Sequence, residues 1–221
     1  MQIFESLIGG NVMYSVLIVD DSAIVRSLFE TVINSSGEGR YRIVEQLKSA
    51  AAAVQYVRQH RTDLVLMDVY TENRENGIEA AGEIKKCSPG TKVIVVTSLP
   101  EMSFIDKSRE AGCESFWYKE HGDMTILEVM DRTMAGESVY PDASPTLDIG
   151  CAKSVEFTRA EVDVLRLLCE GCSNKEIGEA LSVSENTVKT HIKNMLSKAG
   201  YNKKYQLAID AVEKKLIVPG F

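Results

Sequence analysis

Residues 64–77 read LVLMDVYTENRENG, an apolar run that ends in Asp68 and then becomes polar. A short apolar run bounded in this way predicts a buried β-strand. A carboxylate at the end of such a strand costs free energy unless a ligand binds it or it takes part in a reaction. Asp68 is therefore the first candidate functional residue.

Strand-like and helix-like segments alternate on both sides of this run. The strand-like segments read YSVLIVD, YRIVEQL, DLVLMD, TKVIVVTS and ESFWYK, and a helical pattern follows each of them. Strict alternation predicts a parallel sheet of five strands with helices on both faces. Such sheets bind their ligands at the carboxyl ends of the strands.

Polar side chains follow four of these strands. Asp20 and Asp21 follow the first, Asp68 ends the third, Thr97 ends the fourth, and Lys119 follows the fifth. Three carboxylates at one edge repel one another unless a cation lies among them, and oxygen ligands at this density suit Mg²⁺. The lysine and the hydroxyl would complete a phosphoryl site with Asp68 as the nucleophile. Each residue taken singly has an ordinary explanation, as a helix cap, a surface lysine or a strand former, but the combination favours the phosphoryl site.

Four segments resemble the receiver domain of two-component response regulators, over roughly residues 14–135: VLIVDDSAIVR, DLVLMDV, VIVVTS and AGCESFWYKE. The resemblance implies a flavodoxin-like sheet of five parallel strands with flanking helices. It also implies that Asp20, Asp21 and Asp68 bind Mg²⁺ and that a sensor histidine kinase phosphorylates Asp68. The residues that match the switch hydroxyl, the phosphate-contacting lysine and the switch aromatic of the family are Thr97, Lys119 and Phe116. For Phe116 the alternative is a purely structural role as an aromatic residue of the core.

The loop after Asp68 departs from that family. Receivers usually carry a short Met-Pro turn and then a glycine, whereas this chain has Tyr70, Thr71 and Glu72, and Gly77 comes one residue late. The resemblance implies that the backbone carbonyl of Tyr70 completes the metal shell, because any residue offers a carbonyl. We expect metal binding and phosphate lifetime to differ from those of the usual receiver.

An enzyme is the remote alternative. An apolar strand that ends in Asp-x-x-Thr also suggests a haloacid-type phosphohydrolase, whose nucleophilic aspartate starts an Asp-x-Asp motif. The second aspartate of that motif, the general acid, would fall on Tyr70. Because a tyrosine stands there, we expect the chain not to be an enzyme.

The C-terminal part differs in charge and in pattern. Residues 1–150 hold 14 Lys/Arg and 23 Asp/Glu, whereas residues 151–221 hold 11 and 9. Two short helices joined by the turn SVS predict a helix-turn-helix. On the helix after this turn Val188, Ile192 and Met195 must face inward, so the opposite face carries short polar and lysine side chains, which suits a DNA major groove. A charged surface face of an ordinary helix is the alternative.

The segments FTRAEVDVL and GCSNKEIGEALSVSENTVKTHIKNMLSKAG resemble the LuxR-type helix-turn-helix, over residues 156–217. A receiver followed by this domain is the arrangement of the NarL/FixJ class of transcription factors. The resemblance implies an all-α domain of four helices that binds double-stranded DNA, with a fourth helix near 206–214 that pairs two copies in the active homodimer. The implied base-reading residues are Lys189, Thr190 and Lys193, and the implied phosphate contacts are Asn174, Lys175, Thr187 and Lys203.

These patterns divide the chain into a receiver at 14–135, a linker with two prolines at 136–154 and a DNA-binding domain at 155–221. No apolar run approaches the roughly 20 residues that span a bilayer. Residues 1–11 lack the basic start and apolar core of a secretory signal, so we expect a cytoplasmic protein. The CxxC pair Cys169 and Cys172 has no second pair nearby, which favours reduced, semi-buried thiols over a zinc site or a redox pair.

Together these patterns predict a DNA-binding transcriptional regulator that is switched by phosphorylation of Asp68. The charge placed beside Thr97 and Phe116 would shift the population between two states of the domain. The alternative is suggested by the loop that begins at Tyr70. It is a regulator whose receiver acts as a phosphorylation-independent dimerisation or sensing module.

Overall fold

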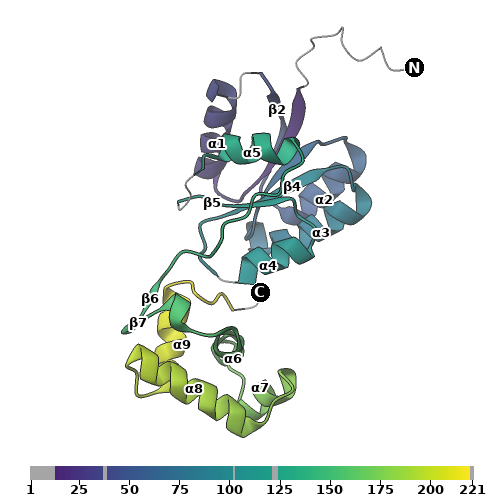
Figure 1. Cartoon of the computed structure of the whole chain (residues 1–221). Coiled ribbons are helices and arrows are strands. Elements are labelled where there is room, and N and C mark those ends of the chain that lie inside the picture. The colour runs from purple at the N-terminus through teal and green to yellow at the C-terminus, as the bar shows by residue number, and fades with distance from the viewer. Residues whose placement is uncertain (1–12, 37–38, 102, 121–123, 220–221) are drawn as a thin grey trace, which may run out of the picture. The chain divides into compact units, whose positions relative to one another are not determined.

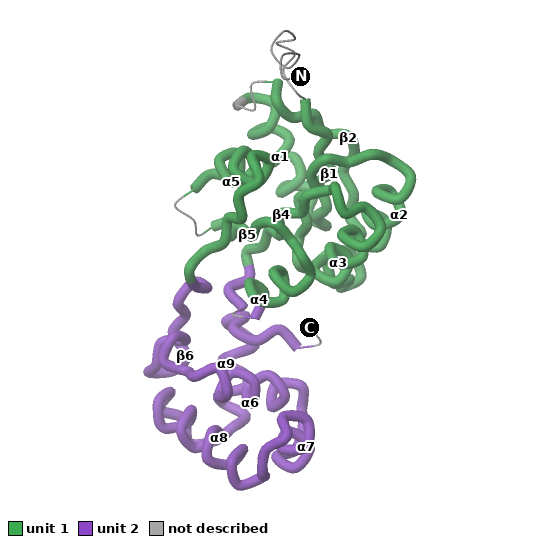
Figure 2. The backbone as a smooth tube through the Cα atoms, turned by 45° about the vertical axis from the view of Figure 1, so that its right-hand side comes forward, with its two compact units in different colours: residues 1–98, 104–142 green, residues 99–103, 143–221 purple. Residues whose placement is uncertain are grey.

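The computed structural model describes residues 13–36, 39–101, 103–120 and 124–219 (Figure 1). The chain forms two compact units, coloured separately in Figure 2. Unit 1 comprises the residues up to Ser98 together with 104–142, and unit 2 comprises 99–103 and 143–221. The prediction about a secretory signal in residues 1–11 lies outside the described residues.

Unit 1 is built on a parallel sheet of five strands in the order β2-β1-β3-β4-β5. This order is that of flavodoxin-like sheets, as the sequence predicts. The run that ends in Asp68 is the central strand and is buried along its whole length. The strands are β1 (Tyr14–Val19), β2 (Tyr41–Leu47), β3 (Leu64–Asp68), β4 (Lys92–Thr97) and β5 (Ser115–Tyr118).

Helices cover both faces of the sheet, which confirms the predicted alternation. One face packs against α1 and α5, whose apolar residues share a core with alternate residues of β1, β3 and β4. On the opposite face α2 and α3 pack against each other and against the central strands, and α4 follows on the same side (Figure 1). The helices are α1 (Ala23–Ser36), α2 (Ala50–Gln59), α3 (Gly77–Cys87), α4 (Ser103–Glu110) and α5 (Ile126–Met134).

The strand register brings the carboxyl ends of the central strands level with one another. Val19 lies opposite Met67, so the next residue of each strand, Asp20 and Asp68, lies at the same edge. Asp68 lies opposite Val96, the residue before Thr97. Thr97 in turn lies opposite Tyr118, the residue before Lys119. The register therefore places the predicted phosphoryl-site residues along one edge of the sheet.

Unit 2 contains the four predicted helices around a core of its own. Ile149, Leu165, Ile177, Val188 and Leu207 are fully buried in this core. A short antiparallel hairpin of β6 (Asp148–Ile149) and β7 (Ala152–Lys153) precedes the helices. The helices are α6 (Arg159–Cys169), α7 (Asn174–Ala180), α8 (Glu185–Ala199) and α9 (Lys204–Glu213).

The segment predicted as a linker, residues 136–154, carries ordered contacts within each unit. In unit 1 the amide of Phe116 donates a hydrogen bond to the carbonyl of Val139 (2.8 Å). In unit 2 the hairpin is held by a hydrogen bond from the amide of Cys151 to the carbonyl of Ala199 (3.0 Å). The chain passes from unit 1 to unit 2 after Asp142. The limits of this linker remain a prediction.

Two further features are the state of the cysteines and the length of the helices. All five cysteines are free, and burial raises the pKa of Cys169 to about 12, so its thiol is protonated near neutral pH. Among the helices that the structure describes, none is long and apolar enough to cross a membrane.

Candidate functional site

Three carboxylates meet at the carboxyl edge of the sheet. Asp20 and Asp21 follow β1 and Asp68 ends β3, and one carboxylate oxygen of each lies within 4.8 Å of the others. Asp20 is 1% exposed and Asp68 is 8% exposed, whereas Asp21 faces the solvent. Asp20 also holds the start of α1, since its Oδ1 accepts a hydrogen bond from the amide of Ser22 (2.9 Å). The structure thus brings together the acidic residues that the sequence predicts as one site.

Lys119 joins two of these carboxylates. Its Nζ donates hydrogen bonds to Asp20 Oδ2 (2.6 Å) and to Asp68 Oδ1 (3.0 Å). Its backbone amide donates to the carbonyl of Thr97 (2.9 Å), which fixes the start of the lysine side chain beside β4. One ammonium group against three carboxylates leaves an excess of negative charge in a largely buried place.

Burial and the neighbouring charges together shift the pKa values of Asp68 and Lys119. Burial raises the pKa of Asp68 to about 7; Lys119 opposes the shift and Asp20 adds to it. Burial disfavours the charged form of Lys119, but the carboxylates of Asp68 and Asp20 outweigh that effect and raise the pKa of the lysine. A divalent cation among the oxygens would favour the ionised form of all three carboxylates. The cluster therefore has the oxygen donors and the charge that suit a hard divalent cation such as Mg²⁺.

The loop after Asp68 contains a short antiparallel bridge between Tyr70 and Asn76. The tip of the loop, Glu72–Arg74, is a single 3₁₀ turn in which Asn73 and Arg74 adopt the left-handed region, with φ values of 61° and 59°. This bridge and turn accommodate the extra residue before the glycine. The bridge is closed by two hydrogen bonds, neither of which uses the Tyr70 carbonyl: Gly77 N to Val69 O (2.9 Å) and Thr71 N to Glu75 O (3.2 Å).

Gly77 is required where it stands, although it comes later than in the usual receiver. A Cβ atom on this residue would lie 1.8 Å from the carbonyl oxygen of Asp68. Only glycine lets the first turn of α3 approach the end of β3 this closely. The position of the glycine is therefore set by the contact with Asp68 and not by the length of the loop.

The predicted switch residues lie in the core of unit 1. Thr97 and Phe116 are each 1% exposed. Tyr140 stacks on the ring of Phe116, with centroids 6.5 Å apart, and its hydroxyl donates to the carbonyl of Cys113 (2.8 Å). The guanidinium carbon of Arg109 lies 4.5 Å from the centroid of the Tyr140 ring. The sequence gives no signal for Tyr140, which falls in the segment predicted as linker.

The helix-turn-helix of unit 2 consists of α7, a tight turn and α8. A Cβ on Gly178 would lie 2.8 Å from the carbonyl oxygen of Val183, so the close approach of the turn to α7 depends on glycine. The face predicted to point inward is confirmed, because Val188, Ile192 and Met195 are at most 6% exposed. The predicted base-reading residues are exposed on the other side of α8: Lys189, Thr190 and Lys193.

The predicted phosphate contacts lie at the amino-terminal ends of three helices. Asn174 and Lys175 open α7, Thr187 lies in the first turn of α8, and Lys203 is the N-cap of α9. The amide groups at such ends favour anions. Lys204 links two of these ends, because its Nζ donates to Asn174 Oδ1 (3.3 Å).

A partly buried ion pair links α8 to α6 and was not predicted from the sequence. Glu161 is 3% exposed, and its Oε2 accepts hydrogen bonds from Lys198 Nζ (2.7 Å) and from the amide of Thr158 (2.8 Å). Burial alone would raise the pKa of Glu161, but the hydrogen bonds from Lys198 and Thr158 outweigh it and lower the pKa.

The substitution Glu161→Gln is expected to lower the free energy of unfolding of unit 2 by about 1.5–3 kcal/mol, the contribution of hydrogen bonds to charged groups. Because the folded pKa is depressed, the carboxylate stabilises unit 2 above its unfolded pKa, and this stabilisation is lost as the pH falls through the folded pKa. Calorimetric unfolding of the full chain at pH 7 and at acid pH measures the difference between the two proteins. A difference that does not shrink at acid pH would contradict the assignment.

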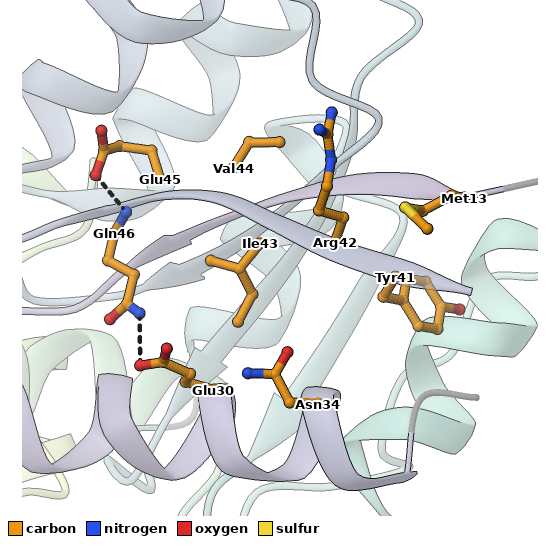
Figure 3. Close-up of a pocket in the computed structure, with 9 residues that line it drawn as sticks. All are labelled: Met13, Glu30, Asn34, Tyr41, Arg42, Ile43, Val44, Glu45 and Gln46. Carbon is orange, nitrogen blue, oxygen red and sulfur yellow. Dashed lines mark hydrogen bonds between the residues drawn. The ribbon is translucent and has the colours of Figure 1, made fainter. Parts of the chain in front are cut away.

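Unit 1 has a further hollow, between the edge strand β2 and α1 (Figure 3). Its volume is about 450 Å³. Two of its lining residues are joined by a hydrogen bond from Gln46 Nε2 to Glu30 Oε2 (3.0 Å). No residue of the acidic cluster lines it, and we assign it no function. The lining residues are Met13, Glu30, Asn34, Tyr41, Arg42, Ile43, Val44, Glu45 and Gln46.

The sheet order, the acidic cluster with its lysine and the helix-turn-helix define a class of regulator in which a receiver precedes a DNA-binding domain. Residues 16–131 match the response regulator receiver domain, and residues 155–211 match the luxR family of bacterial regulatory proteins. The chain therefore belongs to the response regulators that carry a luxR-type domain, and it is a DNA-binding two-component response regulator.

Known proteins resemble the chain over most of its length. The response regulator protein VraR of Staphylococcus aureus is 31% identical over 207 residues, which are 91% of this chain and 98% of VraR. A structure of two RcsB dimers bound to two parallel DNAs matches with a TM-score of 0.61 at 19% identity, covering 89% of this chain and 96% of that chain. RcsB from Salmonella enterica serovar Typhimurium bound to promoter rprA matches with a TM-score of 0.58, also at 19% identity, over 89% and 97% of the two chains. At 19% identity these two structural matches show a shared fold and nothing further.

Proposed function

We propose that Asp68 accepts a phosphoryl group from a sensor histidine kinase and that this modification regulates DNA binding by unit 2. One observation carries the proposal: the nearly buried Asp68 carboxylate lies within 4.8 Å of two further carboxylates and 3.0 Å from Lys119 Nζ. In the reaction an Asp68 oxygen attacks the phosphorus atom of a phosphohistidine. The phosphorus–nitrogen bond breaks, and the histidine leaves.

Mg²⁺ is the proposed cofactor of this site. Asp20, Asp21 and Asp68 would hold it through carboxylate oxygens, and Tyr70 through its backbone carbonyl. When bound, the ion neutralises the charge that develops on the transferred phosphoryl oxygens. Lys119, which lies between Asp20 and Asp68, would then contact the phosphoryl group with its Nζ. The proposal is supported by the donor atoms of the cluster, which are all hard oxygens.

The switch is proposed to run from Asp68 through Thr97 and Phe116. Tyr140 stacks on the ring of Phe116 and is held by Cys113. A reorientation of the Phe116 ring would therefore displace Tyr140, because packed interiors leave no free space for the change. Phosphorylation would thus shift the population between two packings of this face of unit 1.

The output is proposed to be transcriptional control by a homodimer on double-stranded DNA. Lys189, Thr190 and Lys193 would read bases, and the residues at the three helix ends would contact phosphates: Asn174, Lys175, Thr187 and Lys203. Pairing of two copies through α9 is supported by its exposed apolar residues, Tyr205, Ile209 and Val212, which recur at helical spacing.

The remaining parts of the proposal concern organisation and location. The receiver would span 14–135, the linker 136–154 and the DNA-binding domain 155–221. A regulator that binds DNA works in the compartment that holds DNA, so we place the protein in the cytoplasm. Its role is regulatory and not that of an enzyme that turns over a substrate.

The experiment that tests this function measures DNA affinity as a function of phosphorylation. DNA sequences selected from a random library by the full chain serve as the probe, at one salt concentration. We expect treatment with acetyl phosphate and Mg²⁺ to change the affinity of the wild type and to leave Asp68→Asn unchanged. An equal affinity before and after treatment would favour the alternative, a receiver that acts as a phosphorylation-independent dimerisation or sensing module.

A further inference from the structure

The amino-terminal end of α2 is capped in part by residues of the loop that follows Asp68. The first amide groups of an α-helix have no partners inside the helix, and the residue just before the helix usually supplies the cap. Here three consecutive amides each donate to a different side chain, two of which belong to the loop: Ala50 N to Thr71 Oγ1 (3.0 Å), Ala51 N to Glu75 Oε2 (3.0 Å) and Ala52 N to Ser49 Oγ (3.1 Å).

Glu75 is the centre of this arrangement. Its Oε2 also accepts a hydrogen bond from Ser49 Oγ (2.7 Å) and lies 3.4 Å from Thr71 Oγ1. The hydrogen bonds from the Ala51 amide and from Ser49 lower the pKa of Glu75, so the carboxylate is charged at neutral pH. A negative charge at the amino-terminal end of a helix is favourable, because the amide dipoles point toward it.

The same loop is held through its backbone. The amide of Glu72 donates to the carbonyl of Lys48, the residue before the N-cap of α2 (2.9 Å). Thr71 is 2% exposed, so its hydroxyl is shielded from water. The loop is thus fixed to the start of α2 on both sides of its tip.

We infer that Thr71 and Glu75 are positioning residues that hold the Tyr70 carbonyl in place for the divalent cation. Thr71 directly follows Tyr70, and Glu75 directly precedes Asn76, the bridge partner of Tyr70. The two side chains therefore fix both arms of the bridge that carries the carbonyl. In this chain they take over the part that a rigid Met-Pro turn would otherwise play. The inference rests on the proposed function, because it assumes that the acidic cluster binds a cation.

A role confined to stabilising α2 would leave cation binding unchanged. The two roles are separated by measuring Mg²⁺ affinity of the full chain by calorimetric titration, beside the midpoint of thermal unfolding. Outer-shell partners of metal ligands typically contribute about 10- to 100-fold in affinity. We expect a loss of that size for Glu75→Ala, and much less for Glu75→Gln, which keeps an acceptor oxygen for the Ala51 amide.

Glu72→Ala is the matched control, because Glu72 is an exposed glutamate of the same loop whose substitution removes the same charge. It should leave Mg²⁺ affinity unchanged. If Glu75→Ala does not fold, Thr71→Val and Thr71→Ser replace it, and only the valine, which lacks the acceptor for the Ala50 amide, should weaken Mg²⁺ binding. A folded Glu75→Ala protein with wild-type Mg²⁺ affinity would overturn the inference. A wild-type chain that binds no Mg²⁺ would contradict the proposed metal site itself, and the inference with it.

Discussion

Replacement of Lys193 by alanine is expected to weaken binding to a selected DNA sequence by about 1–3 kcal/mol, which is roughly 5- to 150-fold. Lys193 lies on the exposed face of α8, opposite the buried residues Val188, Ile192 and Met195. The short polar and lysine side chains of that face supply the hydrogen-bond donors that base edges in a major groove accept. Fluorescence anisotropy of a labelled duplex, titrated with the full chain at fixed salt, measures the effect.

Two variants separate base reading from general electrostatic attraction. Lys215→Ala removes the same charge from an exposed residue of unit 2 outside α8, and it should bind nearly as the wild type does. Lys203→Ala removes a proposed phosphate contact, so it should weaken binding to selected and unrelated DNA alike. It should also reduce the slope of the logarithm of the affinity against the logarithm of the salt concentration by about 1. Equal losses for Lys193→Ala and Lys215→Ala would show that α8 does not read the groove.

The sequence predicted the acidic site because regular topology turns distance along the chain into proximity in space. Lys119 and Asp20 are 99 residues apart, yet strict alternation of strands and helices already places both at one edge of a parallel sheet. The same holds for the helix-turn-helix, where the spacing of Val188, Ile192 and Met195 fixes the inward face of α8. In both cases a periodic pattern fixes where each side chain points.

The contacts that were not predicted have no counterpart in a periodic pattern of the sequence. Glu75 caps α2 across 26 residues, and only the path of an irregular loop brings it there. Tyr140 reaches Phe116 from a segment whose prolines and polar residues indicate a linker. The pair of Glu161 and Lys198 joins two helices through side chains whose spacing carries no signal. Each of these contacts depends on the three-dimensional course of the chain, which a single sequence does not encode in a local pattern.

Substitution of Asp68, the proposed phosphoryl acceptor, should have the largest effect on phosphorylation. The isosteric change Asp68→Asn keeps an oxygen that can accept the hydrogen bond from Lys119 Nζ, which lies 3.0 Å from Asp68 Oδ1. It removes the anionic oxygen that we propose as the nucleophile toward phosphorus. Asp20 and Asp21 keep their carboxylates in this variant. It therefore tests whether either of them can accept the phosphoryl group in place of Asp68.

The most direct measurement is the intact mass of the full chain after incubation with a small-molecule phosphodonor and Mg²⁺. The wild type should gain the mass of one phosphoryl group, and Asp68→Asn should gain none under the same conditions. A wild type without added mass, or an equal gain in both proteins, would contradict the assignment of Asp68.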